Sequence, residues 1–152
     1  MKWISLFFSF DGRINRLPYW LVGGFWVALA FLAIPLWMMR PVGRGVLPDV
    51  IVLGVLMIPA LISCLAVGVK RLHDRDKSGW WLLFFYGAPA VLDQFATETF
   101  EWSPSFIMQL LSLAISLWMI IELGFMPGSF GVNRFGPDPL LQQRSARSET
   151  LN

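Results

Sequence analysis

The side chains best suited to chemistry lie in one charged stretch, residues 70–81, which has the sequence KRLHDRDKSGWW. His73, the sole histidine, could act as an acid, a base or a metal ligand because the pKa of histidine lies near neutral pH. A structural zinc site usually needs about four ligands, and no second histidine or nearby cysteine accompanies it. We therefore predict no catalytic residue, metal site or cofactor. We expect His73 to lie at head-group level, hydrogen-bonded to a neighbouring group or a lipid phosphate.

The acidic residues of this stretch also have a local structural interpretation. Lys70 and Arg71 precede Asp74 at a spacing that brings side chains together on a helix. Asp76 or Ser78 could cap the helix that follows. Local ion pairs and caps therefore explain these charges without a reaction.

Glu122 is an acidic residue inside an otherwise apolar stretch. An ionisable group within a membrane span is a candidate for function. Glu122 lies near the end of its stretch, however, so we expect it to pair with a basic residue such as Arg71 or Arg13. Pairing is a better explanation than a proton or ion relay, which would need further polar groups along the spans.

The elements that position these residues are membrane helices. The chain has 152 residues, of which 56% are hydrophobic and 14% charged, against about a quarter charged in soluble domains. A soluble protein of this composition would leave large apolar patches in water. The net charge of +2 gives no reason to expect a nucleic-acid partner. We predict an all-α polytopic membrane protein.

Four transmembrane helices are predicted from apolar stretches that approach the length needed to cross a bilayer core of about 30 Å. They cover residues 17–39, 50–69, 79–97 and 105–126. The third stretch crosses only if its helix continues through Asp93 and Gln94. A re-entrant segment is the alternative, because Gly87 and Pro89 interrupt the stretch.

The two ends of the chain differ from these spans. Residues 1–16 are predicted to form a short segment that lies in the membrane interface. We expect residues 1–139 to form a single membrane domain. Residues 140–152 are polar enough to predict a disordered, flexible cytoplasmic tail.

The distribution of lysine and arginine gives the orientation. With four spans, ten basic residues fall on one side, whereas Arg40 and Arg44 alone fall on the other. Basic residues remain in the cytoplasm. We therefore expect a multi-pass protein of the bacterial inner membrane with both termini cytoplasmic.

Small residues recur at four-residue intervals on the predicted spans. Ala60, Cys64 and Gly68 form such a series on the second span, and Gly24 and Ala28 form a short one on the first. Small side chains at this spacing form grooves that admit a neighbouring helix. Ser112 and Ser116 offer a third groove on the last span.

Three motifs carry a resemblance to a known family. They are FDGRINR at residues 10–16 followed by Tyr19-Trp20, the KRLHD and KSGWW parts of residues 70–81, and GVNRFGPDP at residues 131–139. In this order they resemble the domain of unknown function 805 family of small bacterial inner-membrane proteins. Asp76 stands where we expect a glycine. The resemblance implies a polytopic inner-membrane protein and brings no reaction, substrate or cofactor.

All three motifs fall on the predicted cytoplasmic side, where we expect their polar side chains to form one cap. Its candidate members are Arg13, Arg16, Arg71, His73, Asp74, Ser78, Trp80, Asn133, Arg134 and Asp138. We expect the four arginines to pair with Asp74 and Asp138, since arginine suits bidentate pairing.

This cap leads to three functional hypotheses. The first is a non-enzymatic membrane protein that binds lipids, anionic head groups above all, or a partner, which would be a second copy or another membrane protein. The second is a component of a small-solute or ion transporter or channel, supported by helices interrupted at Pro59 and Pro89. The third is a lipid head-group enzyme using His73 and Asp74.

Overall fold

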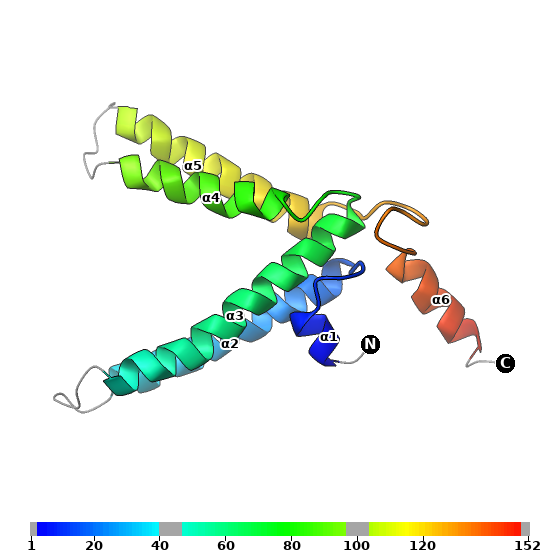
Figure 1. The fold of residues 1–152 in the computed structure, drawn as a ribbon, viewed down its shortest axis with the longest axis horizontal. Coiled ribbons are helices and arrows are strands. Elements are labelled where there is room, and N and C mark those ends of the chain that lie inside the picture. Colours follow the sequence, from blue (N-terminus) through cyan, green and yellow to red (C-terminus); the bar gives the residue numbers. More distant parts are fainter. Residues whose placement is uncertain (1–2, 40–46, 97–103, 150–152) are drawn as a thin grey trace.

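The computed structural model describes residues 3–39, 47–96 and 104–149, whose regular structure is helical throughout (Figure 1). The all-α prediction is therefore confirmed for this part of the chain. The elements in chain order are α1 (Trp3–Phe8), α2 (Arg16–Met38), α3 (Leu47–Asp74), α4 (Trp81–Phe95), α5 (Pro104–Ile120), the π-helical turn η1 (Ile121–Phe125) and α6 (Pro139–Glu149).

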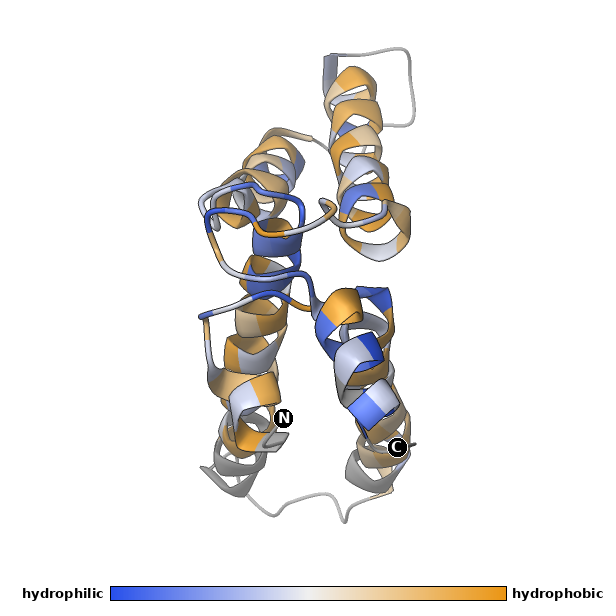
Figure 2. Ribbon diagram, turned by 90° about the vertical axis from the view of Figure 1, so that its right-hand side faces the viewer, coloured by the Kyte–Doolittle hydropathy of each residue, from blue (hydrophilic) through white to orange (hydrophobic). Residues whose placement is uncertain are grey.

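The four long helices form two hairpins, α2 with α3 and α4 with α5, which diverge from a common end in the shape of a V (Figure 1). The turn from α3 to α4 lies at this joined end, and so do η1 and the loop that leads to α6. The far ends of the hairpins carry the C-termini of α2 and α4 and the N-termini of α3 and α5. Apolar residues cover the arms, whereas polar residues gather at the joined end (Figure 2).

Three helical segments are long and apolar enough to cross a membrane: Arg16–Pro35, Gly54–Asp74 and Pro104–Phe125. Large apolar side chains on them point outward, for example Phe31, which is 77% exposed. The third predicted span, residues 79–97, is not confirmed. Its helix α4 has 15 residues, or about 22 Å, and residues 97–103 lie outside the described residues. The helix continues through Gly87 and Pro89, so it contains no re-entrant reversal.

The second predicted span ends too early. We expected it to end at Val69 and residues 70–77 to form a loop, but α3 continues to Asp74. Its basic residues lie on a helix because their long side chains find partners on neighbouring segments. The turn begins at Arg75, and Asp76 adopts a φ of 56°. This left-handed conformation favours glycine, which explains why a glycine was expected at this position.

The predicted disorder of residues 140–152 is also wrong over much of its length, because Pro139–Glu149 form α6. Asp138 starts this helix: its Oδ1 accepts a hydrogen bond from the N–H of Leu140 at 2.9 Å. An aspartate followed by proline is a typical N-cap and first helical residue. The polar composition of residues 140–152 led to the prediction of disorder, although Asp138 and Pro139 mark the start of a helix.

The core lies at the joined end, where two clusters of buried side chains meet. One cluster joins α1, the loop after it, α2 and α3, and the other joins α3, α4 and η1. Their buried members are Leu6, Ile14, Val22 and Val67 in the first and Leu72, Leu82, Phe85 and Leu123 in the second. The core therefore holds together the elements that carry the first two sequence motifs.

Candidate functional site: a polar cap at the joined end

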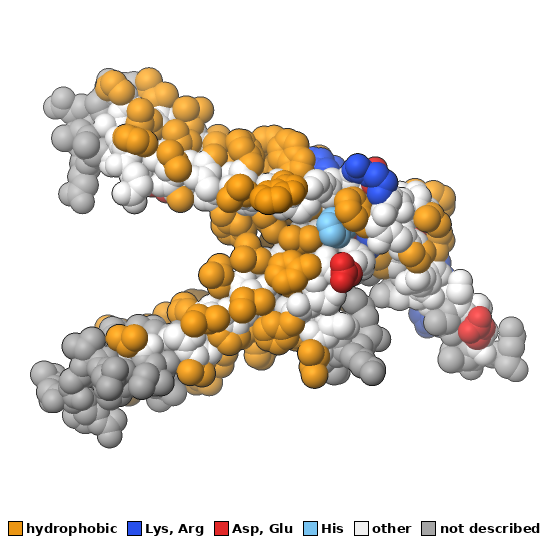
Figure 3. All heavy atoms as spheres, viewed as in Figure 1, with side chains coloured by type: hydrophobic (Ala, Val, Ile, Leu, Met, Phe, Trp, Pro, Cys, Tyr) orange, Lys and Arg blue, Asp and Glu red, His pale blue; other side chains and the backbone are white. Residues whose placement is uncertain are grey.

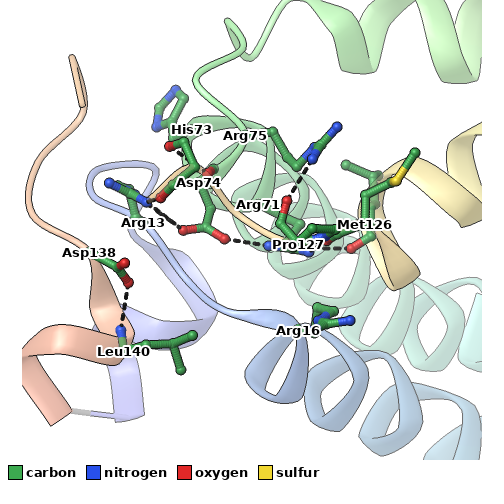
Figure 4. Close-up of polar contacts among 12 residues, drawn as sticks. Arg13, Arg16, Arg71, His73, Asp74, Arg75, Met126, Pro127, Asp138 and Leu140 are labelled. Atoms are coloured by element: carbon green, nitrogen blue, oxygen red, sulfur yellow. Dashed lines mark hydrogen bonds and ion pairs between the residues drawn. The ribbon is translucent and has the colours of Figure 1, made fainter. Parts of the chain in front are cut away.

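The three motifs converge at the joined end, where their side chains form the polar cap (Figure 4). The cap comprises Arg13, Arg16, Arg71, His73, Asp74, Arg75, Glu122, Asn133, Arg134 and Asp138. The residues come from the loop before α2, the end of α3, η1 and the loop before α6. The predicted convergence of distant motifs is thus present in the structure.

Asp74 lies at the centre of the cap, with a side chain only 5% exposed. Its Oδ1 lies 3.1 Å from Arg13 Nη2, and its Oδ2 accepts a hydrogen bond from Arg71 Nη1. Both pairs were predicted. A buried carboxylate is stable only when its charge and lone pairs are satisfied, and two arginines meet this need here.

Arg13 ties the start of the chain to the loop before α6. Its Nη1 donates to the carbonyl oxygens of Gly131 at 2.7 Å and Gly136 at 3.1 Å, and its Nη2 donates to that of Ser129 at 2.6 Å. Its side chain is 1% exposed. The guanidinium is therefore saturated by protein groups.

The π-helical turn presents five consecutive backbone carbonyls, from residues 123 to 127, to side chains of other elements. Arg71 donates to the carbonyl oxygens of Leu123 (2.7 Å) and Met126. Trp20 Nε1 donates to that of Gly124 and Arg16 Nη1 to that of Phe125, both at 3.0 Å. Arg75 Nη1 donates to that of Pro127 at 2.6 Å. A helix C-terminus leaves carbonyls without partners and carries partial negative charge. Basic side chains satisfy both needs.

The C-termini of α1 and α3 are capped in the same way. Lys70 Nζ, on a residue that is 1% exposed, donates to the carbonyls of Ser5 at 2.9 Å and Leu6 at 2.5 Å. At the end of α3, Asn133 Nδ2 donates to the carbonyl of His73 at 2.8 Å, and the backbone N–H of Ser129 donates to that of Asp74 at 2.7 Å. Asn133 thus has the structural position that its motif suggested.

Glu122 is paired, but not with the predicted arginines. Its Oε1 accepts from Arg75 Nε at 3.0 Å and from Lys77 Nζ at 2.7 Å. Arg13 and Arg71 are engaged by Asp74 and by backbone carbonyls, so the turn after α3 supplies the partners instead.

Two further predicted pairings are wrong. Arg134 binds Asp76 Oδ1 at 3.0 Å in an exposed pair, not Asp74 or Asp138. Asp138 accepts from the backbone N–H groups of Leu140 at 2.9 Å and Gly131 at 3.4 Å. Its role as the cap of α6 turns its carboxylate toward backbone rather than toward an arginine.

His73 contacts protein on two sides. Its Nδ1 lies 3.3 Å from the carbonyl oxygen of Gly12, and its ring stacks on Phe135 with centroids 3.8 Å apart and planes 3° apart. Ser78 and Trp80, also predicted members of the cap, lie in the turn before α4. Ser78 Oγ accepts from the N–H of Trp80 at 3.4 Å, and Trp80 is 79% exposed.

Two glycines are essential to the cap and were missed. A Cβ added to Gly128 would overlap the carboxylate of Asp74, and one added to Gly124 would lie 2.5 Å from Trp20 Cζ2. Both glycines allow a side chain to approach the backbone closely. The sequence alone does not indicate that these glycines are important, because the side chains that they contact are distant in the sequence.

In the part of the chain that the structure describes, three cavities lie next to the cap, and one of them, of about 410 Å³, is lined by α6 and the loop before it. The other two are lined in part by α2. The interhelix crevice, of about 290 Å³, is found where the hairpins begin to diverge, and the space-filling view shows apolar side chains lining this wedge (Figure 3). Its walls include Tyr19, Gly23, Gly24, Cys64, Gly68 and Tyr86. Of the small residues predicted to form grooves on the first two spans, Gly24, Cys64 and Gly68 line this crevice, whereas Ala28 and Ala60 do not.

The second of the cavities lined by α2, the cap pocket, has a volume of about 220 Å³ and is more polar in its lining residues. Its walls include Asn15, Arg16, Arg71, Asp74, Asp138 and Leu140. The crevice and the cap pocket share no lining residue, but α2 contributes to both: its start, at Asn15 and Arg16, lines the pocket, and its next turns line the crevice. Across the described ranges, no three His, Cys, Asp or Glu side chains converge in a way that could hold a metal ion.

Fold and site together define a small α-helical membrane protein in which one polar cap joins two apolar hairpins. The chain belongs to the family described as protein of unknown function (DUF805), whose model matches residues 7–137. This match confirms the resemblance and includes the first two motifs and the third as far as Pro137.

Several curated relatives come from Escherichia coli K12. The chain is 31% identical to the inner membrane protein YhaH over 146 residues, which cover 93% of this chain and 96% of the relative. It is 31% identical to the uncharacterized protein YiiR over 134 residues, 86% of each chain. It is 24% identical to the inner membrane protein YhaI over 144 residues, 91% of this chain and 96% of the relative. No solved structure matches the chain significantly.

Proposed function

We propose that this protein is a non-enzymatic phospholipid-binding protein that crosses the bacterial inner membrane four times, with its cap and both termini in the cytoplasm. The observation that carries the proposal is that one helix, α2, lines a charged pocket at its start and an apolar crevice along its next turns. A phospholipid has the same order of parts, an apolar chain joined to a charged head group.

The topology is supported by the common direction of the two hairpins. Both have their joined ends at the cap and their free ends on the opposite side (Figure 1). The cap and the residues beside it hold seven of the nine lysine and arginine residues in the described part of the chain, and basic residues favour the cytoplasmic side. α4 runs beside α5 along the same arm, so a membrane crossed by α5 also surrounds α4.

The crevice suits an acyl chain because of its walls and its depth. It is lined by aromatic side chains and by Gly23 and Gly24, at which an added Cβ would meet nothing within 4 Å. Its residues belong to apolar helices, where the surrounding solvent is hydrocarbon. A crevice there is filled by a lipid chain more readily than by water, since water would lose its hydrogen bonds.

Arg16 is the residue that would bind the lipid phosphate. Its Nη1 donates to the carbonyl of Phe125 at 3.0 Å, and the residue is exposed. A guanidinium has five N–H donors, so Arg16 retains donors for a phosphate oxygen. Arg13 and Arg71 are buried and engaged. The more accessible Arg75 and Arg134 pair with Glu122 and Asp76 and do not line the cap pocket, so Arg16 is the cap arginine to which we assign the phosphate.

The non-enzymatic part of the proposal is supported by the partners of the two residues that an enzyme would need. Asp74 is held by two arginines, and His73 is stacked on Phe135 and adjoins Gly12. Both side chains have structural roles that account for their presence.

Native mass spectrometry after gentle detergent extraction tests the proposal. The wild-type protein should retain about one phospholipid, and Gly24→Leu, which fills the crevice, should lose it. Gly54→Leu is the matched control: an added Cβ at Gly54 also meets nothing within 4 Å, and this glycine does not line the crevice. Equal lipid retention by the two variants, at equal helicity in circular dichroism, would contradict the proposal.

A further inference from the structure

We propose that the head group bound in the cap pocket carries a primary ammonium and no carboxylate, so that the lipid is a phosphatidylethanolamine rather than a phosphatidylserine. Asp138 and Asp74 in the pocket wall would repel a carboxylate. This inference rests on the proposed function and deepens it by naming the lipid class. It arises because the pocket presents acceptors for a cation as well as a donor for a phosphate.

Asp138 supplies the negative side of the pocket. Its residue is 8% exposed, and its carboxylate is hydrogen-bonded by the backbone N–H groups of Leu140 and Gly131. Among the described residues, no basic side chain pairs with the Asp138 carboxylate, whereas basic side chains pair with those of Asp74 and Glu122. A buried carboxylate without a cation is costly, and a bound ammonium would remove this cost.

Asn15 supplies a second acceptor. Its Oδ1 is buried and has no hydrogen-bond partner, although Asn15 occupies the N-cap position of α2, where such an oxygen usually accepts a backbone N–H. A buried polar atom without a partner costs free energy. Asn15 and Asp138 both line the pocket. Because the Asn15 Oδ1 atom is itself buried, the Asn15 amide must turn toward the pocket to share a donor group with Asp138.

A primary ammonium matches these two acceptors better than other head groups. It carries three N–H donors and a positive charge, as lysine does. A choline has the charge but no N–H donor, and a glycerol has donors but no charge. The pocket, at about 220 Å³, has room for about seven water molecules, which is close to the size of a phosphoethanolamine group.

Arg16 binds the phosphate of the same lipid, and the acyl chain continues along α2 into the crevice. The pocket and the crevice are lined by successive turns of this helix, residues 15–16 and 19–27. Along α2 the ammonium would therefore lie near Asp138, the phosphate at Arg16 and the acyl chain in the crevice.

The experiment compares three phospholipids with identical acyl chains. The delipidated protein in detergent is titrated with phosphatidylethanolamine, phosphatidylcholine or phosphatidylglycerol, and bound lipid is counted by native mass spectrometry. We expect the ethanolamine lipid to bind about tenfold more tightly than the choline lipid, since hydrogen bonds to a charged group are strong. Soluble phosphoethanolamine at the same concentration should not displace it, because it lacks the acyl chain.

Asp138→Asn removes the charge but keeps a good N-cap for α6, because asparagine and aspartate are about equally favourable there. It should bring the affinities for the ethanolamine and choline lipids together. Asp93→Asn, a matched change on α4 outside the pocket, should leave the preference intact. Asn15→Ser provides a second variant, which should weaken the same preference.

The outcomes separate the two proposals. Similar wild-type affinities for all three lipids would overturn the head-group assignment but leave phospholipid binding in place. Displacement by soluble phosphoethanolamine would show that the head group binds without an acyl chain, and it would overturn the proposed phospholipid binding. Failure of all three lipids to bind would overturn both.

Discussion

The two sides of the polar cap differ in how far their charges are satisfied by the protein itself. On the Asp74 side, two buried arginines and a carboxylate engage one another and a series of backbone carbonyls. On the pocket side, Arg16 has donors to spare, Asp138 has no cation among the described residues, and Asn15 Oδ1 has no partner. The first side holds helices together, and the second is the side at which we propose that the lipid binds.

The largest effect should follow Gly128→Ala, which tests the satisfied side. The new Cβ would overlap the Asp74 carboxylate and separate it from Arg13 and Arg71. Disrupting a buried ion pair costs about 3–5 kcal/mol, so thermal unfolding in detergent should occur at a much lower temperature. Gly87→Ala is the control, because an added Cβ there meets nothing within 4 Å. Wild-type stability of the Gly128 variant would mean that Asp74 does not depend on this close approach.

Gly124→Ala should have the next largest effect. Its Cβ would lie 2.5 Å from Trp20 Cζ2, so the indole must move and lose its bond to the Gly124 carbonyl. Overpacking of this kind costs about 1–3 kcal/mol. In a double-mutant cycle with Trp20→Phe, the cost of the alanine should fall, because the smaller ring leaves room. Strict additivity of the two changes would show that the contact is not the cause.

Glu122→Gln should cost less, about 1 kcal/mol, because its partners are near the surface. The side chains of Arg75 and Lys77 are 21% and 29% exposed, so water can replace the lost carboxylate. Asp74→Asn is the matched comparison and should cost several times more in the same denaturation assay. A Glu122 variant as unstable as the Asp74 variant would contradict the contrast between buried and accessible pairs.

Arg16→Gln should have the smallest effect on stability and a large one on binding. It removes one hydrogen bond to the Phe125 carbonyl, which is worth about 1 kcal/mol, while it removes the proposed phosphate partner. Unfolding temperature and lipid retention should therefore respond differently. If unfolding temperature falls sharply and lipid retention does not change, Arg16 belongs to the satisfied side of the cap.

The sequence predicted those parts of the cap in which residue type itself names the partner. Arg13, Arg71 and Asp74 belong to charged motifs, and side chains of opposite charge on the same side of a membrane are expected to form ion pairs. The partners of Arg16, Lys70 and Arg75 were not predictable in this way, because they include backbone carbonyls, which every residue possesses. The π-helical turn that exposes these carbonyls has no recognisable composition either.

The helices show a similar division. Apolar length predicted α2, α3 and α5 because burial in lipid requires it, whereas α4 is shorter than the predicted span. α3 continues beyond its apolar stretch because the side chains of Lys70, Arg71 and Asp74 bond to groups that are distant in the sequence. α6 was missed because its signal is a cap at Asp138 rather than an apolar face.

The five carbonyls of residues 123–127 have a consequence for biosynthesis. Their donors, on residues 16, 20, 71 and 75, are synthesised long before the acceptors: Arg16 is 109 residues ahead of Phe125, and Arg13 is 123 residues ahead of Gly136. The first hairpin must therefore wait in the membrane with its arginines incompletely bonded until the last helix is inserted. Chains that terminate early, before the loop that follows η1, would remain open at the cap and exposed to quality-control proteases.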